Sequence, residues 1–400
     1  MIRPLHLLFE TIGNISMIKP KIVCVAGGGN NEECIFDFLR DSYVPALFLA
    51  SINQKCRFIY FDGERRVSKE FPIGYVPSPL RPLLNGYLIF RKVFSCITPP
   101  IDVVVADSIY MCTWALRLRG KGMIKKVVYF CGDWFPWHDT SLSFLQRLFR
   151  KHIYKRLDII CARNADMVWS VSDRLNAIRA EYAADLLNAN KMLKYPMAFK
   201  IPKKRGNTDG IQILYIGIPR EDHCLEMLIR GMYQIYSRTK ASIHLDIVGH
   251  SDYVSHLREY VQKYGMEKMV TFHGMILPGP ELDTIVSRCN MGFALYRTVG
   301  TENYSYYGFP TKIIQYFSFG LPVIASDITE FAGTIRQLSL GYIIPVDESA
   351  LVNVLGLAMN ESMIDFQANI AKFVKEQNEM AQKAYRDRIG MLIDDGCTKA

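Results

Sequence analysis

The chain has 400 residues, of which half are hydrophobic and 22% are charged. This length and composition predict two globular domains and exclude an intrinsically disordered chain. The ten cysteines include no Cys-x-x-Cys pair, which argues against a zinc site or a disulfide framework and favours a reducing cytoplasm.

Positive charge is concentrated in the first half of the chain. Residues 1–195 carry 27 Lys and Arg against 17 Asp and Glu, whereas the remaining residues carry 21 against 22. A charge excess confined to one half predicts an anionic partner for that half.

No segment reaches the roughly 20 apolar residues of a membrane span. The first 17 residues are too short for a signal peptide and are interrupted by His6 and Glu10, and Met17 is an equally good start. We therefore expect a cytoplasmic protein that is peripheral at the inner face of the cell membrane.

The first strand is predicted at residues 22–29, where an apolar run enters a glycine loop. This is the usual opening of a doubly wound α/β domain. Gly27, Gly28 and Gly29 are consecutive, so they do not form the Gly-x-Gly-x-x-Gly fingerprint of dinucleotide binding. The loop either faces a ligand or is simply a tight strand-to-helix turn.

The strand pattern continues through the first half. Strands are predicted at residues 56–61, 102–108 and 126–130, with an irregular proline-rich loop and a helix at 83–96 between the first two.

Asp133 follows the strand at 126–130 directly, at the end of the sheet where open α/β domains bind ligands. A carboxylate there can act as a general base, and the rings of Trp134 and Trp137 can stack on a sugar. Alternatively, Asp133 caps a helix and the tryptophans pack in the core. His138 and Asp139 are second-choice bases.

The segment from Leu142 to Cys161 is predicted to form an amphipathic helix. Its apolar stripe, which we expect to face the core, consists of Leu142, Leu145, Phe149, Ile153, Leu157 and Ile160. Arg147, Arg150, Lys151, Lys155 and Arg156 flank that stripe. The basic flank is either a solvated face or, given the charge of this half, a surface for an anionic membrane.

A strand and a helix are expected at 165–175, and a loose segment at 195–210 reads as an interdomain linker. Strands beginning near residues 211, 242, 270 and 291 alternate with helices, and a polar helix is expected at 361–393. This order predicts an α/β protein with two Rossmann-like doubly wound domains facing each other, at residues 1–195 and 210–400. Such proteins often return their last helix to the first domain.

The most informative stretch runs from Tyr307 to Ser326. It predicts a loop, a short helix begun by Pro310, a glycine stop at Gly320 and a buried strand. Lys312 and Gln315 share one face of the helix with Tyr316 and Phe319, so they can bind a phosphate and a neighbouring sugar hydroxyl. The alternative is an ordinary helix in which Lys312 and Gln315 are only solvated.

This stretch resembles the donor-binding helix of group 1 glycosyltransferases of the GT-B fold, which commonly read Pro-x-Lys-x-x-Glu-Tyr followed by Gly-x-Pro-Val-Ile-Ala. The matching residues are Pro310, Lys312, Tyr316, Gly320, Pro322, Val323, Ile324 and Ala325. Gln315 departs from the family's ribose-binding glutamate. Lys-x-x-Gln-Tyr is more similar to the membrane-associated glucuronosyltransferases of polysaccharide assembly.

The resemblance implies a metal-independent transfer of a sugar from a nucleoside diphosphate sugar, UDP- or GDP-linked, to a lipid-linked or polysaccharide-precursor acceptor. No cofactor and no nucleic acid are implied. It implies donor binding by Gly217, Arg220, Tyr296, Tyr307, Thr311, Lys312 and Gln315. It implies acceptor binding by Gly28, Gly29, Trp134 and His138, with Asp133 as the base of an inverting reaction.

Three alternatives remain at this point. Arg220 either binds phosphate or forms an ordinary salt bridge to Glu221 or Asp222. The protein could instead be a nucleotide-sugar 2-epimerase of the same fold, which needs several acid/base carboxylates. It could also be a non-catalytic nucleotide-sugar-binding protein, because Gln315 replaces the family's glutamate.

Overall fold

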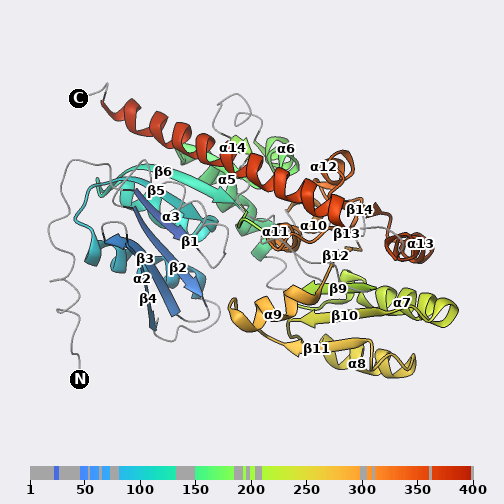
Figure 1. The fold of residues 1–400 in the computed structure, drawn as a ribbon. Coiled ribbons are helices and arrows are strands. Elements are labelled where there is room, and N and C mark those ends of the chain that lie inside the picture. The colour runs from blue at the N-terminus through green and yellow to red at the C-terminus, as the bar shows by residue number, and fades with distance from the viewer. Residues whose placement is uncertain are drawn as a thin grey trace, which may run out of the picture. The chain divides into compact units, whose positions relative to one another are not determined.

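The fold was analysed in a computed structural model (Figure 1). The structure describes residues 22–26, 46–52, 55–62, 65–72, 81–131, 149–183, 192–194, 199–202, 210–297, 304–308, 311–359 and 363–397. The chain divides into two compact units: residues 1–198 with 379–400, and residues 199–378.

The first unit is built on an eight-stranded sheet in the order β4-β3-β2-β1-β5-β6-β7-β8. Its strands are β1 (Ile22–Ala26), β2 (Ala46–Ile52), β3 (Lys55–Asp62), β4 (Arg65–Pro72), β5 (Ile101–Asp107), β6 (Ile124–Cys131), β7 (Met167–Ser170) and β8 (Met192–Lys194). Six of them pair in parallel, and β3 and β4 form an antiparallel edge. The parallel core confirms the predicted α/β class.

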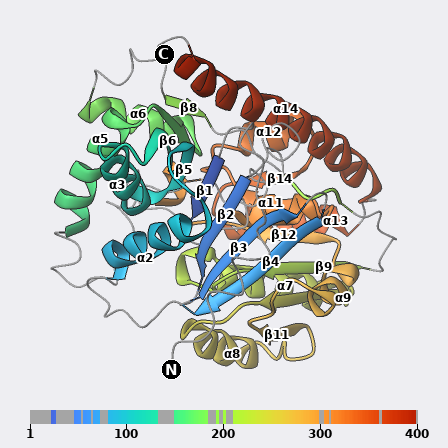
Figure 2. The ribbon, with the colours of Figure 1, turned by 90° about the vertical axis from the view of Figure 1, so that its left-hand side faces the viewer.

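The helices of this unit are α2 (Arg81–Cys96), α3 (Ser108–Arg119), the π-helical turn η3 (Phe149–Tyr154), α5 (Lys155–Asn164) and α6 (Asp173–Tyr182). α3 contacts both α2 and α5, and the three helices lie together in Figure 2. Apolar residues of β1, β5 and β6 form the core with Trp169 of β7.

The antiparallel edge corrects the predicted irregular loop after residue 61. β4 pairs with β3 through a tight connection, because Asp62 and Arg65 are partners in the register. β4 is rich in charged residues, as edge strands often are, so it lacks the apolar run of a buried strand. The two residues between the paired strands are Gly63 and Glu64, and a glycine at the first of two loop positions is a hairpin signal. β2 and β8 were also not predicted.

The predicted apolar face of the helix at 142–161 is wrong where the structure describes it. Ile153 and Ile160 are 47% and 49% exposed, whereas Tyr154, Asp158 and Cys161 are buried. The error lies in the direction of the face, because Ile153 and Ile160 still share one side of the helical segment but that side is exposed.

A buried ion pair explains the orientation of α5. Asp158 accepts hydrogen bonds from Nε and Nη2 of Arg179 at 2.8 and 2.9 Å and from the hydroxyl of Tyr129 at 2.6 Å. Arg179 Nη1 also donates to Ser170 Oγ at 2.6 Å. Both charged side chains are fully buried, so α5 must present Asp158 to the interior, and its isoleucines then face outward.

The second unit carries a six-stranded parallel sheet in the order β11-β10-β9-β12-β13-β14. Its strands are β9 (Ile211–Ile216), β10 (Ile243–Val248), β11 (Val270–Gly274), β12 (Met291–Ala294), β13 (Val323–Ser326) and β14 (Gly341–Ile344). The strand order reverses at β9, so the carboxyl ends of β9 and β12 flank the switch point of a doubly wound sheet.

The helices of the second unit are α7 (Leu225–Thr239), α8 (Tyr253–Lys263), α9 (Pro280–Arg288), α10 (Tyr304–Tyr307), α11 (Thr311–Ser318), α12 (Ala332–Gln337) and α13 (Glu348–Ala358), with the 3-10 turn η5 (Glu221–His223). Apolar residues of α7, α8 and α13 share a core with β9 and β10.

The helix α14 (Ile364–Cys397) contributes to both units. Phe373 packs against Phe199 in the second unit, with ring centroids 5.5 Å apart. Tyr385 packs against Trp169 in the first unit, at 5.2 Å. No helix in the described part of the chain combines the length and hydropathy needed to cross a bilayer.

We expect Asp158→Asn to lower the free energy of unfolding of the protein by about 3–5 kcal/mol, because it leaves the charge of Arg179 buried and unpaired. Urea denaturation measures this loss. Asp173→Asn is the matched control, since Asp173 forms an exposed ion pair with Lys194, which is worth about 1 kcal/mol or less. Equal effects of the two substitutions would contradict the role assigned to the buried pair.

Candidate functional site

The loop after β9 makes a close backbone approach at the switch point. Gly217 has φ +124°, and a Cβ at this position would lie 3.0 Å from Cε of Lys312. A Cβ on Gly249 would lie 1.8 Å from the carbonyl oxygen of Gly217. Glycine is therefore required at both positions, and the structure brings Gly217 and Lys312 into contact, two residues that the sequence placed in one site.

Lys312 lies at the start of α11 with its ammonium between two aromatic rings. Nζ is 5.3 Å from the ring centroid of Tyr215 and 5.2 Å from that of Tyr296, within the range of cation–π attraction. Desolvation, with a further contribution from Arg220, lowers the pKa of Lys312 to about 8 despite the opposing charge of Asp222. No carboxylate of the described residues lies within ion-pair distance of this ammonium. The site therefore favours an anion.

Arg220 lies beside this ammonium and forms a salt bridge. Its Nε is 3.0 Å from Oδ1 of Asp222, and both side chains are partly buried. The salt-bridge alternative from the sequence is thus what the structure shows. The bridge also holds a second positive charge close enough to lower the pKa of Lys312.

His223 is a site residue that the sequence analysis missed. Its ring is 3% exposed and packs edge-on against Tyr296, with centroids 5.3 Å apart. Nδ1 lies 2.6 Å from the hydroxyl of Tyr215, which itself donates to the carbonyl of Ile218 at 2.8 Å. Because that hydroxyl proton is already used, Nδ1 carries the imidazole proton and Nε2 carries the lone pair.

The imidazole of His223 is neutral and incompletely bonded. Burial, with the positive charges of Lys312 and Arg220, lowers the pKa of His223 to about 2. Nε2 is buried and has no hydrogen-bond partner within the described chain. The site thus holds an unused acceptor beside a cation. No local sequence pattern marks His223, since its importance depends on contacts with Tyr215 of β9 and with Tyr296, which follows β12.

Tyr316 does not belong to the ligand face on which the sequence placed it. It is fully buried, and its hydroxyl accepts from the amide of Ile216 at 3.2 Å and donates to the carbonyl of Phe293 at 2.9 Å. It clamps α11 to β9 and β12. Gly292 makes room for the ring, because a Cβ there would lie 2.3 Å from it.

The remaining predicted donor residues lie on or beside α11. Thr311 is exposed and Gln315 is half-buried on α11, whereas Tyr307 is buried at the end of α10. Gly320 has φ +71° and ends the helix as predicted. Their donor roles stay predictions. The candidates Gly28, Gly29, Asp133, Trp134 and His138 lie outside the described residues, as does Pro310.

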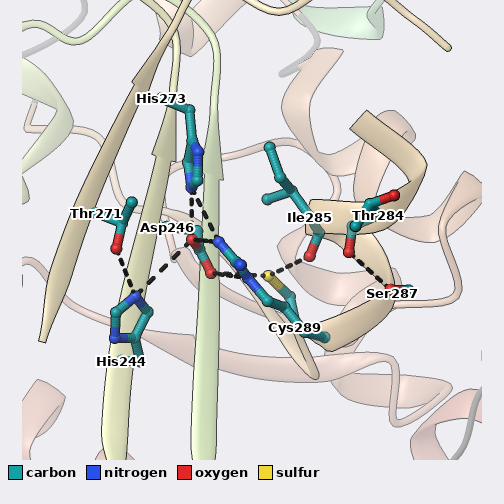
Figure 3. A network of polar contacts seen from close by, with 9 residues as sticks. His244, Asp246, Thr271, His273, Thr284, Ile285, Ser287 and Cys289 are labelled. Atoms are coloured by element: carbon teal, nitrogen blue, oxygen red, sulfur yellow. Dashed lines mark hydrogen bonds and ion pairs between the residues drawn. The ribbon is translucent and has the colours of Figure 1, made fainter. Parts of the chain in front are cut away.

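A second polar network at the edge of the sheet is shown in Figure 3. Asp246 on β10 accepts from Nε2 of His273 at 2.6 Å and from both Nε and Nη2 of Arg288. Burial opposes ionisation, but these hydrogen bonds prevail and hold the pKa of Asp246 below its usual range. The charges are matched, so this network ties α9 to β10 and β11 and needs no ligand.

No cluster of three or more His, Cys, Asp or Glu side chains in the described part of the chain could hold a metal ion.

Residues 210–360 match the family model of group 1 glycosyl transferases. The second unit is a group 1 glycosyltransferase domain. Its boundaries enclose β9, η5 and α11, and hence the described site around Lys312. No curated protein sequence matches the chain significantly.

Solved structures establish the fold of the whole chain. Sucrose-phosphate synthase from Thermosynechococcus elongatus is similar over 95% of this chain and 100% of its own, with a TM-score of 0.67 and 16% identity. The Anabaena protein HepE, solved in complex with UDP, is similar over 94% and 100%, with a TM-score of 0.62 and 14% identity.

A third similar structure is a UDP-forming alpha,alpha-trehalose-phosphate synthase from Burkholderia xenovorans. It is similar over 94% of this chain and 100% of its own, with a TM-score of 0.65 and 11% identity. These likenesses confirm the predicted GT-B fold.

The lowered pKa of Lys312 predicts that a diphosphate would bind to this site in a pH-dependent way. A bound diphosphate would raise the pKa of Lys312 above its free value of about 8, so its affinity would fall as the pH rises above 8. We expect UDP affinity to weaken by up to about tenfold per pH unit between pH 8 and 9.5.

Isothermal titration with UDP at pH 7 and pH 9.5 measures this effect. Lys312→Arg is the control, because a guanidinium stays charged throughout this range. A wild-type affinity as insensitive to pH as that of Lys312→Arg would show that Lys312 does not titrate in the free site.

Proposed function

We propose that the protein is a metal-independent glycosyltransferase that moves a sugar from a nucleoside diphosphate sugar, UDP- or GDP-linked, to a lipid-linked or polysaccharide-precursor acceptor. The observation that carries this proposal is the Lys312 ammonium. It lies against the backbone of Gly217 with no carboxylate of the described residues in ion-pair range. A diphosphate would complete this site.

The donor would bind at the switch point of the second unit. Gly217 would let the diphosphate approach the backbone, and Lys312 with Arg220 would neutralise its charge. Gln315 would bind a ribose or sugar hydroxyl, and the lone pair of His223 Nε2 would accept from another. Tyr296, Tyr307 and Thr311 would line the pocket.

The transfer itself would need a base and a stabilised leaving group. In an inverting reaction, Asp133 would take the proton of the acceptor hydroxyl while the oxygen of that hydroxyl attacks the anomeric carbon of the donor sugar. The bond from that carbon to the diphosphate oxygen would then break, and Lys312 would stabilise the negative charge of the departing diphosphate. In a retaining reaction, Asp133 need not be a base.

The acceptor would be bound by the first unit. The charge excess of residues 1–195 supports an anionic acceptor, and a lipid diphosphate at the inner face of the cell membrane has this chemistry. We assign acceptor contacts to Gly28, Gly29, Trp134 and His138, and a peripheral position at the membrane to the whole protein.

The epimerase alternative is less well supported. It would need several acid/base carboxylates around the donor, and the carboxylate described beside Lys312 is Asp222, which is paired with Arg220.

Lys312→Met tests the donor site. We expect it to weaken UDP affinity about 100-fold, because it removes a charge-assisted contact. In the absence of ligand it should raise the free energy of unfolding at pH 7 by about 1–3 kcal/mol. At this pH Lys312 is protonated, and its lowered pKa means that the fold disfavours the charged form, which the substitution removes. Titration with UDP and urea denaturation measure the two effects.

Lys268→Met is the matched control, because Lys268 is exposed in the same unit. It should leave both quantities unchanged. A thermal-shift panel of nucleoside diphosphate sugars would then identify the donor, since a ligand that binds only the folded state raises its stability. The donor assignment fails if no member of the panel stabilises the wild type at millimolar concentration.

Asp133→Asn tests the base. We expect it to reduce sugar transfer at least about 1,000-fold while UDP affinity stays unchanged, because the amide cannot take the acceptor proton. Asp139→Asn is the control and should retain transfer. If Asp139→Asn loses transfer and Asp133→Asn retains it, Asp139 is the base. If both variants retain full transfer activity, neither carboxylate is the general base.

A further inference from the structure

The outer surface of η3 and α5 combines apolar and basic side chains. Ile153 and Ile160 are 47% and 49% exposed, and Arg156 and Arg163 are exposed on the same helical segment. The four positions are spaced three, four and three residues apart, so they share one side of the helix. We refer to these four residues as the α5 face. Figure 2 shows α5 at the outer side of α3.

The α5 face has no negative charge on its own helical segment. Between residues 149 and 164 the chain has one carboxylate, Asp158, against five Lys and Arg. Asp158 is fully buried and bound to Arg179. Arg156 pairs with none of the described residues. No carboxylate of η3 or α5 therefore lies beside the positive charges of this surface.

The exposed isoleucines cannot turn inward. Rotating α5 to bury Ile153 and Ile160 would withdraw Asp158 from Arg179 and from the hydroxyl of Tyr129. Breaking a buried ion pair is far more unfavourable than leaving two isoleucines half exposed. The buried ion pair thus keeps Ile153 and Ile160 at the surface, beside Arg156 and Arg163.

We propose that the α5 face docks on an anionic phospholipid bilayer. The two isoleucines enter the boundary between headgroups and acyl chains, and the two arginines bind lipid phosphates. This inference rests on the proposed function, because it names the surface that would keep a transferase beside a lipid-linked acceptor.

Flotation of the full chain with lipid vesicles tests the α5 face. We expect binding to vesicles of 70% phosphatidylcholine and 30% phosphatidylglycerol, and much weaker binding to phosphatidylcholine alone. Ile153→Ser with Ile160→Ser should weaken binding to the anionic vesicles about tenfold. Arg156→Gln with Arg163→Gln should weaken it about 20-fold, at roughly one order of magnitude for 1.4 kcal/mol.

A control variant combines one apolar and one arginine substitution on the surface of the second unit. Leu357 is 53% exposed on α13 and Arg238 is exposed on α7, so Leu357→Ser with Arg238→Gln removes comparable groups. It should bind vesicles like the wild type. Thermal unfolding of every variant establishes that the first unit remains folded.

The outcomes separate the proposals. If the arginine variant binds weakly and the isoleucine variant binds fully, the surface recognises polyanions in general and bilayer docking is wrong. It is also wrong if the wild type ignores the anionic lipid or both variants bind normally. UDP-induced thermal shifts are measured in parallel. A variant that loses vesicle binding but keeps its UDP shift has lost only the function of the α5 face. A wild type without a UDP shift contradicts the donor site and leaves the vesicle result to be judged separately.

Discussion

The ammonium of Lys312 rests against the backbone of Gly217, between the rings of Tyr215 and Tyr296. A cation so placed loses hydration without gaining a carboxylate from the described residues, so the surrounding fold must hold it there. Tyr316 supplies that restraint by joining α11 to β9 and β12. The geometry of the second unit is therefore organised around a charge that a ligand would complete.

The first unit contains the opposite arrangement. Asp158 and Arg179 are both fully buried, and each is satisfied by the other and by Tyr129 or Ser170. Such a pair needs no ligand and instead determines which side of α5 faces the core. The contrast distinguishes the two kinds of buried charge: the satisfied pair orients an element, whereas the unsatisfied cation beside the lone pair of His223 indicates a binding site.

Sequence patterns predicted five of the six strands of the second unit, all except β14, because those strands are short apolar runs between glycines and helices. The strand after Gly320 and the left-handed glycine itself were both within reach of local reasoning. The family resemblance placed Gly217 and Lys312 in one site, and the structure shows their contact. The same reasoning failed for β4, whose charged residues hide an edge strand. It also failed for Tyr316, which helical periodicity placed with Lys312 although its hydroxyl bonds to two strands.

The sequence by itself determined the α/β class, the alternation of strands and helices in the second unit, the loop at Gly217 and the cation at Lys312, because these depend on residues close together in the chain. Only the tertiary structure decided that His223 belongs to the site and that Ile153 and Ile160 lie at the surface. Both outcomes depend on contacts between distant segments: His223 with Tyr215, and Asp158 with Arg179. A buried polar group must find its partner wherever the fold places it, and periodicity along one helix carries no information about that partner.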